Sequence, residues 1–285
     1  MIPRPVAQAG ERVVSVRNLR YVYEGGIEAL KNINLDIASG EYMALVGGNG
    51  SGKTTLAKHF NGLLRPTGGK VFIMGRPAAE MSVAELSRIV GYAFQNPDHQ
   101  LFCSTVEEEI AFGPRNLGFA EVQTKERVGY AAETLELEDV LEKPPASMDL
   151  GTRRRVSIAS VIAMDPKVLI LDEPTTGLDA DETKALMGIV SGLNREGRTV
   201  VLITHEMKLV SEHANRVVVM LDGRIVLDSD ARGAFSDLEL LKRCSLLPPP
   251  VTCLAHRLSH LGVSREVLST DELVFELTRP GGDRR

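Results

Sequence analysis

Short apolar runs with strand-like spacing recur along most of the chain. Alternation at Ile33–Ile37, and in part at Val13–Tyr23, predicts strands with one buried face. Continuous apolar runs at Tyr42–Val46 and Val168–Leu171 predict strands that are buried on both faces. Further strands are predicted at Lys70–Met74, Ile89–Phe94 and Thr199–Ile203, and in a hairpin of Val217–Leu221 with Arg224–Leu227.

Helical segments separate these strands. The sequence predicts helices at Lys53–Leu63, Ser82–Arg88, Ala180–Arg195 and Met207–His213. Residues 97–165 are predicted to be mostly helical, with breaks at prolines, and to form a helical subdomain inserted into the core. Strands that alternate with helices form mostly parallel sheets, so the predicted fold class is α/β.

The two ends of the chain differ from this core. Residues 1–12 are expected to form a flexible tail, and residues 13–245 the main domain. Residues 246–285 are expected to form a small C-terminal extension that begins with a proline-rich joint. Within it, apolar spacing predicts a helix at Val251–Leu261 and a last short strand at Leu273–Leu277.

Composition narrows the class of protein. Hydrophobic residues make up 43% and charged residues 25%, as in ordinary globular proteins. A formal net charge of −5 argues against non-specific nucleic-acid binding, which requires a basic surface. Three cysteines without a CxxC pair favour a reducing, cytoplasmic compartment. The chain shows no signal-peptide run and no apolar stretch of about 18 residues, so work at a membrane would need a membrane part from another chain.

One glycine-rich segment carries a complete phosphate-binding motif. Between a buried strand and a helix stands GGNGSGKTT, which matches G-x-x-x-x-G-K-[ST]. Backbone N–H groups of such a loop surround a β-phosphate, and the helix N-terminus adds its dipole. The lysine lies between β- and γ-phosphates, and the threonine hydroxyl is offered to Mg²⁺. The candidate nucleotide-binding residues here are Gly47, Gly48, Asn49, Gly50, Ser51, Gly52, Lys53, Thr54 and Thr55.

Two carboxylates end the apolar strand Val168–Leu171. Asp172 stands where a Walker B aspartate holds Mg²⁺, and Glu173 is placed to polarise an attacking water. The alternative is a pair of solvated turn carboxylates, which the wholly apolar strand before them disfavours.

Together these motifs resemble those of ATP-binding-cassette (ABC) ATPases over about residues 13–245. Tyr23 resembles the aromatic A-loop residue that stacks on adenine, and Gln95 resembles the Q-loop glutamine that contacts Mg²⁺ and water. Asp179 resembles the D-loop aspartate that touches an opposite subunit, and His205 the switch histidine that contacts the γ-phosphate. The resemblance implies a P-loop NTPase core with a mixed, mainly parallel sheet, an antiparallel β subdomain, and ATP and Mg²⁺ as cofactors.

Each of the single residues also has a simpler interpretation. Tyr23 could be a packing residue of a strand, Gln95 an ordinary loop glutamine, and His205 a neighbour of a helix N-cap. Their order and spacing along the chain favour the ABC interpretation.

A narrower resemblance links the chain to energy-coupling factor (ECF) ATPases, which include cobalt and nickel importer subunits. Gln95–Phe102 and Thr105–Pro114 carry it, and Leu247–Val251 with the following helix resembles the C-terminal extension that pairs two ATPases. The resemblance implies a second ATPase, identical or different, and a transmembrane coupling subunit whose helices enter a groove formed after Gln95. It also implies a membrane protein that captures a metal ion or vitamin, and a location on the cytoplasmic face of the cell membrane.

The ABC signature Leu-Ser-Gly-Gly-Gln is degenerate in this chain. Its five positions are occupied by Met148, Asp149, Leu150, Gly151 and Thr152, so only the second glycine remains. In the family, this serine and these glycines bind the γ-phosphate held by the opposite subunit. An anion at 149 and a side chain at 150 predict a defective signature and an asymmetric ATPase pair. A tolerated variant with unchanged hydrolysis is the alternative.

Two further features allow competing interpretations. Cys244, Cys253, His256 and His260 loosely suggest a metal site, but leucines in the same stretch favour a plain packing helix. The triplet Arg153–Arg155 is interpreted as the solvated start of a helix near phosphate or a partner, rather than as a basic patch.

Two other functions are the alternatives to an ECF-type ATPase. A mechanical ABC ATPase acting on DNA would need a long coiled-coil insertion, and the interval from Lys53 to Met148 is too short for one. A P-loop kinase would lack the Asp-Glu pair followed by a D-loop and a switch histidine. Release of inorganic phosphate without an acceptor molecule distinguishes hydrolysis from phosphate transfer to a substrate.

Overall fold

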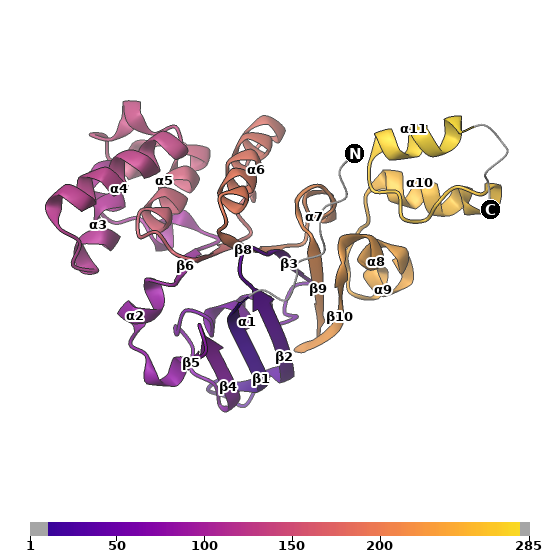
Figure 1. Ribbon diagram of the computed structural model, residues 1–285, viewed down its shortest axis with the longest axis horizontal. Helices are drawn as coiled ribbons and strands as arrows, with labels where there is room; N and C mark the ends of the chain where they lie inside the picture. The colour runs from indigo at the N-terminus through magenta and orange to yellow at the C-terminus, as the bar shows by residue number, and fades with distance from the viewer. Residues whose placement is uncertain (1–10, 280–285) are drawn as a thin grey trace.

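The computed structural model describes residues 11–279, which form two sheets flanked by helices (Figure 1). The larger sheet has six strands, parallel except for its edge strand β10, and its strand order is β10-β9-β3-β8-β7-β6. The smaller sheet is antiparallel, with order β2-β1-β4-β5. The strands of the larger sheet are β3 (Tyr42–Val46), β6 (Val90–Ala93), β7 (Val168–Asp172), β8 (Thr199–Thr204), β9 (Arg216–Leu221) and β10 (Arg224–Asp230). Those of the smaller sheet are β1 (Arg12–Val22), β2 (Glu28–Ala38), β4 (Gly68–Ile73) and β5 (Arg76–Pro77).

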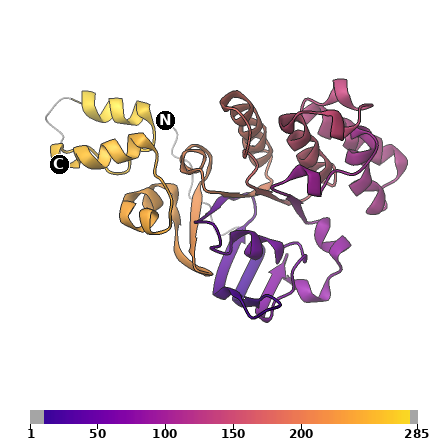
Figure 2. The same cartoon turned by 180° about the vertical axis from the view of Figure 1, so that it is seen from behind.

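Two groups of helices lie at opposite ends of this arrangement (Figure 1). Figures 1 and 2 show α3, α4 and α5 grouped at one end, and α10 and α11 at the other. The α-helices are α1 (Lys53–Lys58), α2 (Val83–Ser87), α3 (Val106–Asn116), α4 (Glu121–Thr134), α5 (Leu150–Ile162), α6 (Ala180–Arg195), α7 (Met207–His213), α8 (Ala231–Ser236), α9 (Leu238–Arg243), α10 (Pro250–Leu258) and α11 (Thr270–Thr278). Short 3₁₀ helices occur at Ala78–Glu80, Pro97–His99, Glu138–Val140, Pro145–Ser147 and Ser259–Leu261.

The central strands are apolar on both faces because both faces are covered. Ala44 and Leu171 belong to the cluster that packs against the helical side, whereas Met43 and Ile170 belong to the cluster shared with the antiparallel sheet and α1. Successive strand residues point to opposite faces, so a continuous apolar run is what this position in the fold requires. The predicted α/β class with a mixed, mainly parallel sheet is confirmed.

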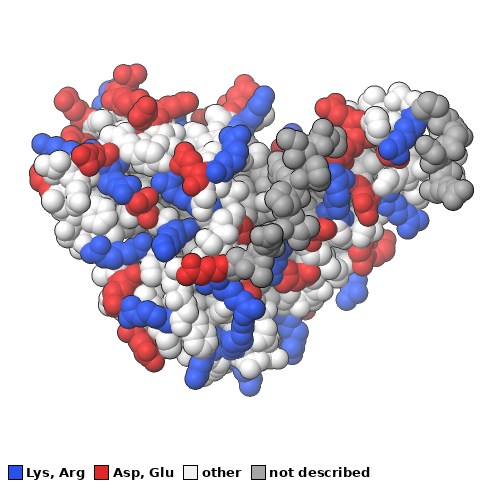
Figure 3. Space-filling view, in the orientation of Figure 1, with Lys and Arg blue, Asp and Glu red and all other residues white. Residues whose placement is uncertain are grey.

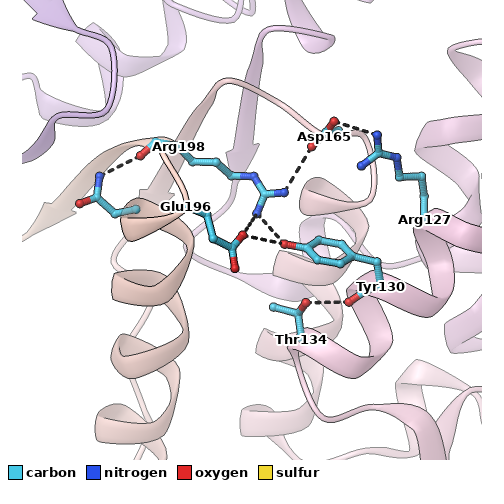
Figure 4. A network of polar contacts seen from close by, with 7 residues as sticks. Arg127, Tyr130, Thr134, Asp165, Glu196 and Arg198 are labelled. Carbon is cyan, nitrogen blue, oxygen red and sulfur yellow. Dashed lines mark hydrogen bonds and ion pairs between the residues drawn. The ribbon is translucent and has the colours of Figure 1, made fainter.

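A polar network joins the helical group to the large sheet (Figure 4). Arg198, just before β8, donates to the Tyr130 hydroxyl of α4 at 2.9 Å and to Asp165 at 3.2 Å. Its guanidinium lies 5.4 Å from the Tyr130 ring centroid, and Glu196 completes the cluster. The side chain of Arg198 is 13% exposed, whereas those of Asp165 and Glu196 are 42% and 58% exposed, so the network connects α4 to the chain before β8 close to the surface.

Two predicted elements are wrong in type or length. Leu273–Leu277 lies within helix α11, not in a strand; Ser269 caps that helix by accepting from the N–H of Glu272. The first helix ends at Lys58 rather than Leu63, because the N–H groups of His59 and Phe60 bond to carbonyl oxygens only three residues back. The left-handed Gly62 lies in the turn that follows.

Parts of the predicted tail and of the predicted C-terminal extension lie outside residues 11–279. These parts are residues 1–10 of the expected tail and residues 280–285 of the expected extension, and Arg12 already belongs to β1. Among residues 11–279, no helix is both long enough and apolar enough to cross a membrane.

Candidate functional site

A pocket of about 630 Å³ opens at the carboxyl ends of β3 and β7. Parallel sheets commonly bind ligands at this edge, since the loops that leave neighbouring strands converge there. The lining combines the glycine-rich loop, the strand-end carboxylates and part of β2, with the following residues: Tyr23, Ile27, Glu28, Ala29, Lys31, Asn49, Gly50, Ser51, Gly52, Lys53, Thr54, Thr55, Gln95, Asp172, Glu173, Asp222 and Gly223.

The loop before α1 depends on glycine at two closely packed positions. Gly47 has φ +151°, and a Cβ there would lie 2.3 Å from the carbonyl oxygen of Met220. Gly52 has φ +103°, and a Cβ there would lie 2.9 Å from the carbonyl oxygen of Ala29. Both contacts are to backbone atoms, which cannot yield, so any side chain would displace the loop.

Lys53 is folded into this loop. Its Nζ donates to the carbonyl oxygens of Gly47 at 2.8 Å and Gly48 at 3.0 Å. Burial lowers the pKa of Lys53, and the nearby charges of Glu173 and Asp172 oppose that shift. An ammonium group in this position is available to an incoming anion at the cost of two main-chain hydrogen bonds.

Thr54 and Asp172 form a pair of oxygen ligands at the loop. The Thr54 hydroxyl donates to Asp172 Oδ2 at 3.0 Å, and Asp172 is 4% exposed. Hydroxyl and carboxylate oxygens are ligands that Mg²⁺ takes in nucleotide sites, usually together with phosphate oxygens and waters. The donor set therefore fits a magnesium ion bound with a nucleotide.

Glu173 lies beside this pair with one oxygen unused. Its Oε1 is 2.8 Å from His205 Nδ1, while its buried Oε2 has no hydrogen-bond partner among the described residues. The residue has φ +48°, a left-handed conformation that few non-glycine residues adopt. A strained backbone that places a buried carboxylate with a free acceptor in a pocket is typical of a functional site.

Tyr23 and Gln95 both line the pocket. The Tyr23 hydroxyl is 2.9 Å from Thr55 Oγ1, and its ring makes an edge contact with Tyr21 at 4.8 Å between centroids. Its ring, with the side chain 39% exposed, is available at the mouth of the pocket.

The signature and D-loop positions lie outside this pocket. Asp149 is the N-cap of α5: its Oδ1 accepts from the N–H of Thr152 at 2.7 Å. The space beside Gly151 is filled by the Glu182 carboxylate, since a Cβ there would lie 2.2 Å from Glu182 Oε1. Leu150 packs on Gly177, and Asp179 caps α6. Within one chain, therefore, Met148–Thr152 and Asp179 do not join the glycine-rich loop.

Two buried residues near the site have contacts that the sequence did not predict. Tyr92 on β6 donates its hydroxyl to Asp172 Oδ2 at 2.6 Å; a hydroxyl in an apolar strand was the one available signal. Arg154 is 3% exposed and donates to the carbonyl oxygens of Phe94, Gln95 and Thr176. The expectation of a solvated Arg153–Arg155 segment is therefore wrong for Arg154, which is held by main-chain acceptors.

The C-terminal cysteines and histidines do not converge. His256 Nε2 is 3.1 Å from the carbonyl oxygen of Phe235, and His260 Nδ1 is 2.7 Å from that of Arg257. Across the described part of the chain, no group of three His, Cys, Asp or Glu side chains is arranged to hold a metal ion. Thr252, Ala255 and Leu273 are instead buried where α10 and α11 pack, as a packing helix requires.

Comparison with known proteins places these features in a family. The sequence model of the ABC transporter family matches residues 30–176. The energy-coupling factor transporter ATP-binding protein EcfA of Methanocaldococcus jannaschii is 41% identical over 244 residues, which cover 85% of this chain and 88% of that protein. An ABC transporter ATP-binding protein of Caldanaerobacter subterraneus is 46% identical over 93% of this chain. The chain spans only 46%, 43% and 40% of the length of the first three curated relatives.

Solved structures agree with the sequence matches. The cbiO1 protein of Clostridium perfringens, described as part of the ABC transporter complex cbiONQ, superposes with a TM-score of 0.74 at 35% identity, over 88% of this chain and 98% of that one. The cassette MJ0796, solved as a dimer after hydrolysis with ADP and Pi bound, gives a TM-score of 0.70 at 28% identity, over 77% of this chain and 99% of that one. The fold is that of an ABC ATPase, and the chain belongs to the ABC transporter family of ATP-binding proteins, in the group of the energy-coupling factor ATPases.

Proposed function

We propose that this chain binds ATP with Mg²⁺ and hydrolyses it as the energising subunit of an ECF-type importer. The observation that carries the proposal is the convergence of Lys53, Thr54, Asp172 and Glu173 in one pocket, with a buried Glu173 oxygen that has no partner within residues 11–279. The cargo is a cobalt or nickel ion or a vitamin, held by another subunit.

The side chains of the pocket would have the following roles in ATP binding and hydrolysis. Lys53 and the loop N–H groups bind the β- and γ-phosphates, and Tyr23 stacks on the adenine. Thr54, Asp172 and Gln95 hold a magnesium ion, which when bound neutralises developing phosphate charge. Glu173 accepts the proton of the attacking water or orients it, and His205, hydrogen-bonded to Glu173, contacts the γ-phosphate.

A cavity on the helical subdomain supports docking of a transmembrane coupling subunit. Phe102 and Phe112 are 67% and 45% exposed and meet edge-on at 4.8 Å between ring centroids. They line a cavity of about 460 Å³ together with Arg115. The buried Glu109 carboxylate accepts from the N–H groups of Phe102 and Cys103, both at 2.8 Å, and so fixes the segment that follows Gln95.

The surface charge fits a protein partner rather than a nucleic acid. In Figure 3, basic and acidic side chains are interspersed over the visible face, and no continuous basic stripe crosses it. At the far end, Leu254, Leu261 and Phe275 are exposed on the unit formed by α10 and α11, which suits the proposed pairing of two ATPases.

The altered signature favours an asymmetric pair. The hydrogen bond from the Thr152 N–H lowers the pKa of Asp149 below its usual 3.8, so the carboxylate is charged at neutral pH. A carboxylate about 4 Å from a phosphate oxygen costs roughly 4 kcal/mol at an effective dielectric near 20. That is enough to slow catalysis about a thousandfold. The Glu182 carboxylate beside Gly151 adds negative charge to the same surface. The site completed by this signature is proposed to be inactive, whereas the site built on Lys53 can act with a partner's intact signature.

Replacing Lys53 tests the nucleotide site. Lys53→Ala is expected to weaken ATP binding by about 10- to 100-fold, since a charged hydrogen-bond donor contributes about 1.5–3 kcal/mol. Binding is measured by equilibrium dialysis with labelled ATP. Lys58→Ala is the matched control, because Lys58 lies on the same helix outside the pocket. Equal affinity of the Lys53 variant and the control would contradict the assignment.

Glu173→Gln separates hydrolysis from binding. The amide keeps the shape of the side chain but cannot accept a proton, so in a pair whose partner supplies an intact signature phosphate release should fall at least a hundredfold while ATP affinity stays within about twofold. Glu212→Gln, on α7, serves as the control. Phosphate release is followed without any acceptor substrate, so turnover that requires an acceptor would instead support a kinase. Normal hydrolysis by Glu173→Gln would exclude it as the catalytic carboxylate.

Asp149 caps helix α5, and its contribution to the free energy of unfolding should depend on pH. Asp149→Ala is expected to lower the free energy of unfolding by about 1 kcal/mol at pH 7, as loss of an N-cap does. The folded pKa is depressed, so this contribution is present above 3.8 and is lost as the pH falls through the lower, folded value. Asp149→Ser keeps a cap that does not titrate. Denaturant titrations at pH 7 and pH 3 measure the difference; a pH-independent loss would contradict the ionised cap.

Restoring the signature tests the asymmetry. If the chain pairs with itself, Asp149→Ser combined with Leu150→Gly should raise phosphate release by at least tenfold at saturating Mg-ATP. The physical reason is the loss of one carboxylate and one side chain from the phosphate-facing surface. Light scattering verifies the paired state of both proteins. Rapid hydrolysis by the unmodified homodimer, unchanged by the double substitution, would show that the altered signature is functional.

A further inference from the structure

We infer that Tyr92 is a positioning residue for the metal site, acting through Asp172. This inference rests on the proposed function, because it concerns how Asp172 is presented to a magnesium ion. Its basis is a single contact: the Tyr92 hydroxyl donates to Asp172 Oδ2 at 2.6 Å, a short distance typical of a hydrogen bond to a charged acceptor.

The strand register explains why the phenol reaches that carboxylate. Tyr92 on β6 pairs with Ile170 on the parallel strand β7, and both side chains belong to the same apolar cluster. Asp172 is two residues beyond Ile170 and therefore points to the same face of the sheet. A tyrosine side chain laid along the strand direction spans this offset and brings its hydroxyl to Asp172.

The environment makes this contact rigid. Tyr92 is 6% exposed and Asp172 is 4% exposed, so water does not compete for the hydrogen bond. The Tyr92 ring also packs against Phe94 at 4.9 Å between centroids, next to Gln95. One aromatic side chain thus joins the strand-end carboxylate to the segment that carries the proposed magnesium-binding glutamine.

The phenol leaves the metal-binding atoms of the site available. Thr54 also donates to Asp172 Oδ2, at 3.0 Å, and this hydroxyl would turn to the metal when the ion binds. The hydrogen bond from Tyr92 to Oδ2 restricts the rotation of the Asp172 carboxylate group. Partners that orient a metal-binding carboxylate in this way typically contribute 10- to 100-fold to metal affinity.

The chain supplies a matched control for the loss of a buried phenol. Tyr42 on β3 is 2% exposed, and its hydroxyl has no hydrogen-bond partner within the described residues. Tyr42→Phe removes a buried oxygen that bonds to none of the described residues, whereas Tyr92→Phe removes the equivalent atom from its contact with Asp172.

The first measurement is the Mg²⁺ concentration that half-saturates the metal-dependent part of ATP binding. Tyr92→Phe is expected to raise this concentration about tenfold, and Tyr42→Phe to leave it unchanged. ATP binding in EDTA should be the same for Tyr92→Phe and the wild type. An unchanged Mg²⁺ requirement would overturn the inference, as would an equal loss of binding with and without metal.

The second measurement does not depend on nucleotide or metal. Unfolding midpoints in EDTA are compared for the wild type, Tyr92→Phe, Asp172→Ala and the double variant. We expect Tyr92→Phe to lower the midpoint in the wild type but not in the Asp172→Ala background, where the acceptor is gone. Equal shifts in both backgrounds would reduce Tyr92 to a packing residue. If Lys53→Ala and the wild type bind ATP equally, the proposed function fails, while this cycle still decides whether Tyr92 holds Asp172.

Discussion

A buried ammonium group beside two buried carboxylates is the constraint on which the site depends. Lys53, Asp172 and Glu173 are 8%, 4% and 7% exposed. Charges removed from water are destabilising unless each one meets an opposite charge or hydrogen-bond partners. Lys53 satisfies this with two carbonyl oxygens, and Asp172 with two hydroxyls, but one Glu173 oxygen has no partner in the part of the chain that the structure describes. Among the described residues, the hydrogen bonding of Glu173 is therefore incomplete, and this carboxylate lines the pocket.

The surrounding fold can be understood as the scaffold that makes this burial possible. The charged residues follow β3 and β7, whose side chains are buried on both faces of the sheet. Close packing of the loop on Met220 and Ala29 leaves room only for glycine at positions 47 and 52. The strands thus provide a rigid, water-poor base, and the glycines allow the backbone to turn tightly above it.

The sequence correctly predicts those elements whose pattern of apolar residues and motifs fits only one kind of structure. Buried strands and the phosphate loop belong to this class, because apolar runs next to a complete motif leave few alternatives. Leu273–Leu277 does not, since five residues of which four are apolar fit a strand or a helix equally well. The capping interaction of Ser269 with Glu272 and the ion pair of Glu272 with Arg232 at 2.6 Å select the helix. The domain limits and the roles of the site residues remain predictions.

The burial of Arg154 is a second feature that the sequence does not predict. Three consecutive arginines were expected to be solvated, because charged side chains are seldom buried. Only the structure shows that Arg154 faces inward, where backbone carbonyl oxygens from two loops replace its water. These acceptors carry no side-chain identity, so no residue pattern could have revealed them.

Arg154 also connects helix α5 to two segments at the edge of the pocket. Its guanidinium connects α5, which begins at the signature, to the carbonyl oxygens of Phe94 and Gln95 and to that of Thr176, in the turn after Glu173. A buried guanidinium that lost these acceptors would be left without hydrogen bonds, at a cost of several kcal/mol. These contacts therefore favour a fixed arrangement of the start of α5 against the backbone at Gln95 and Thr176, at the edge of the pocket.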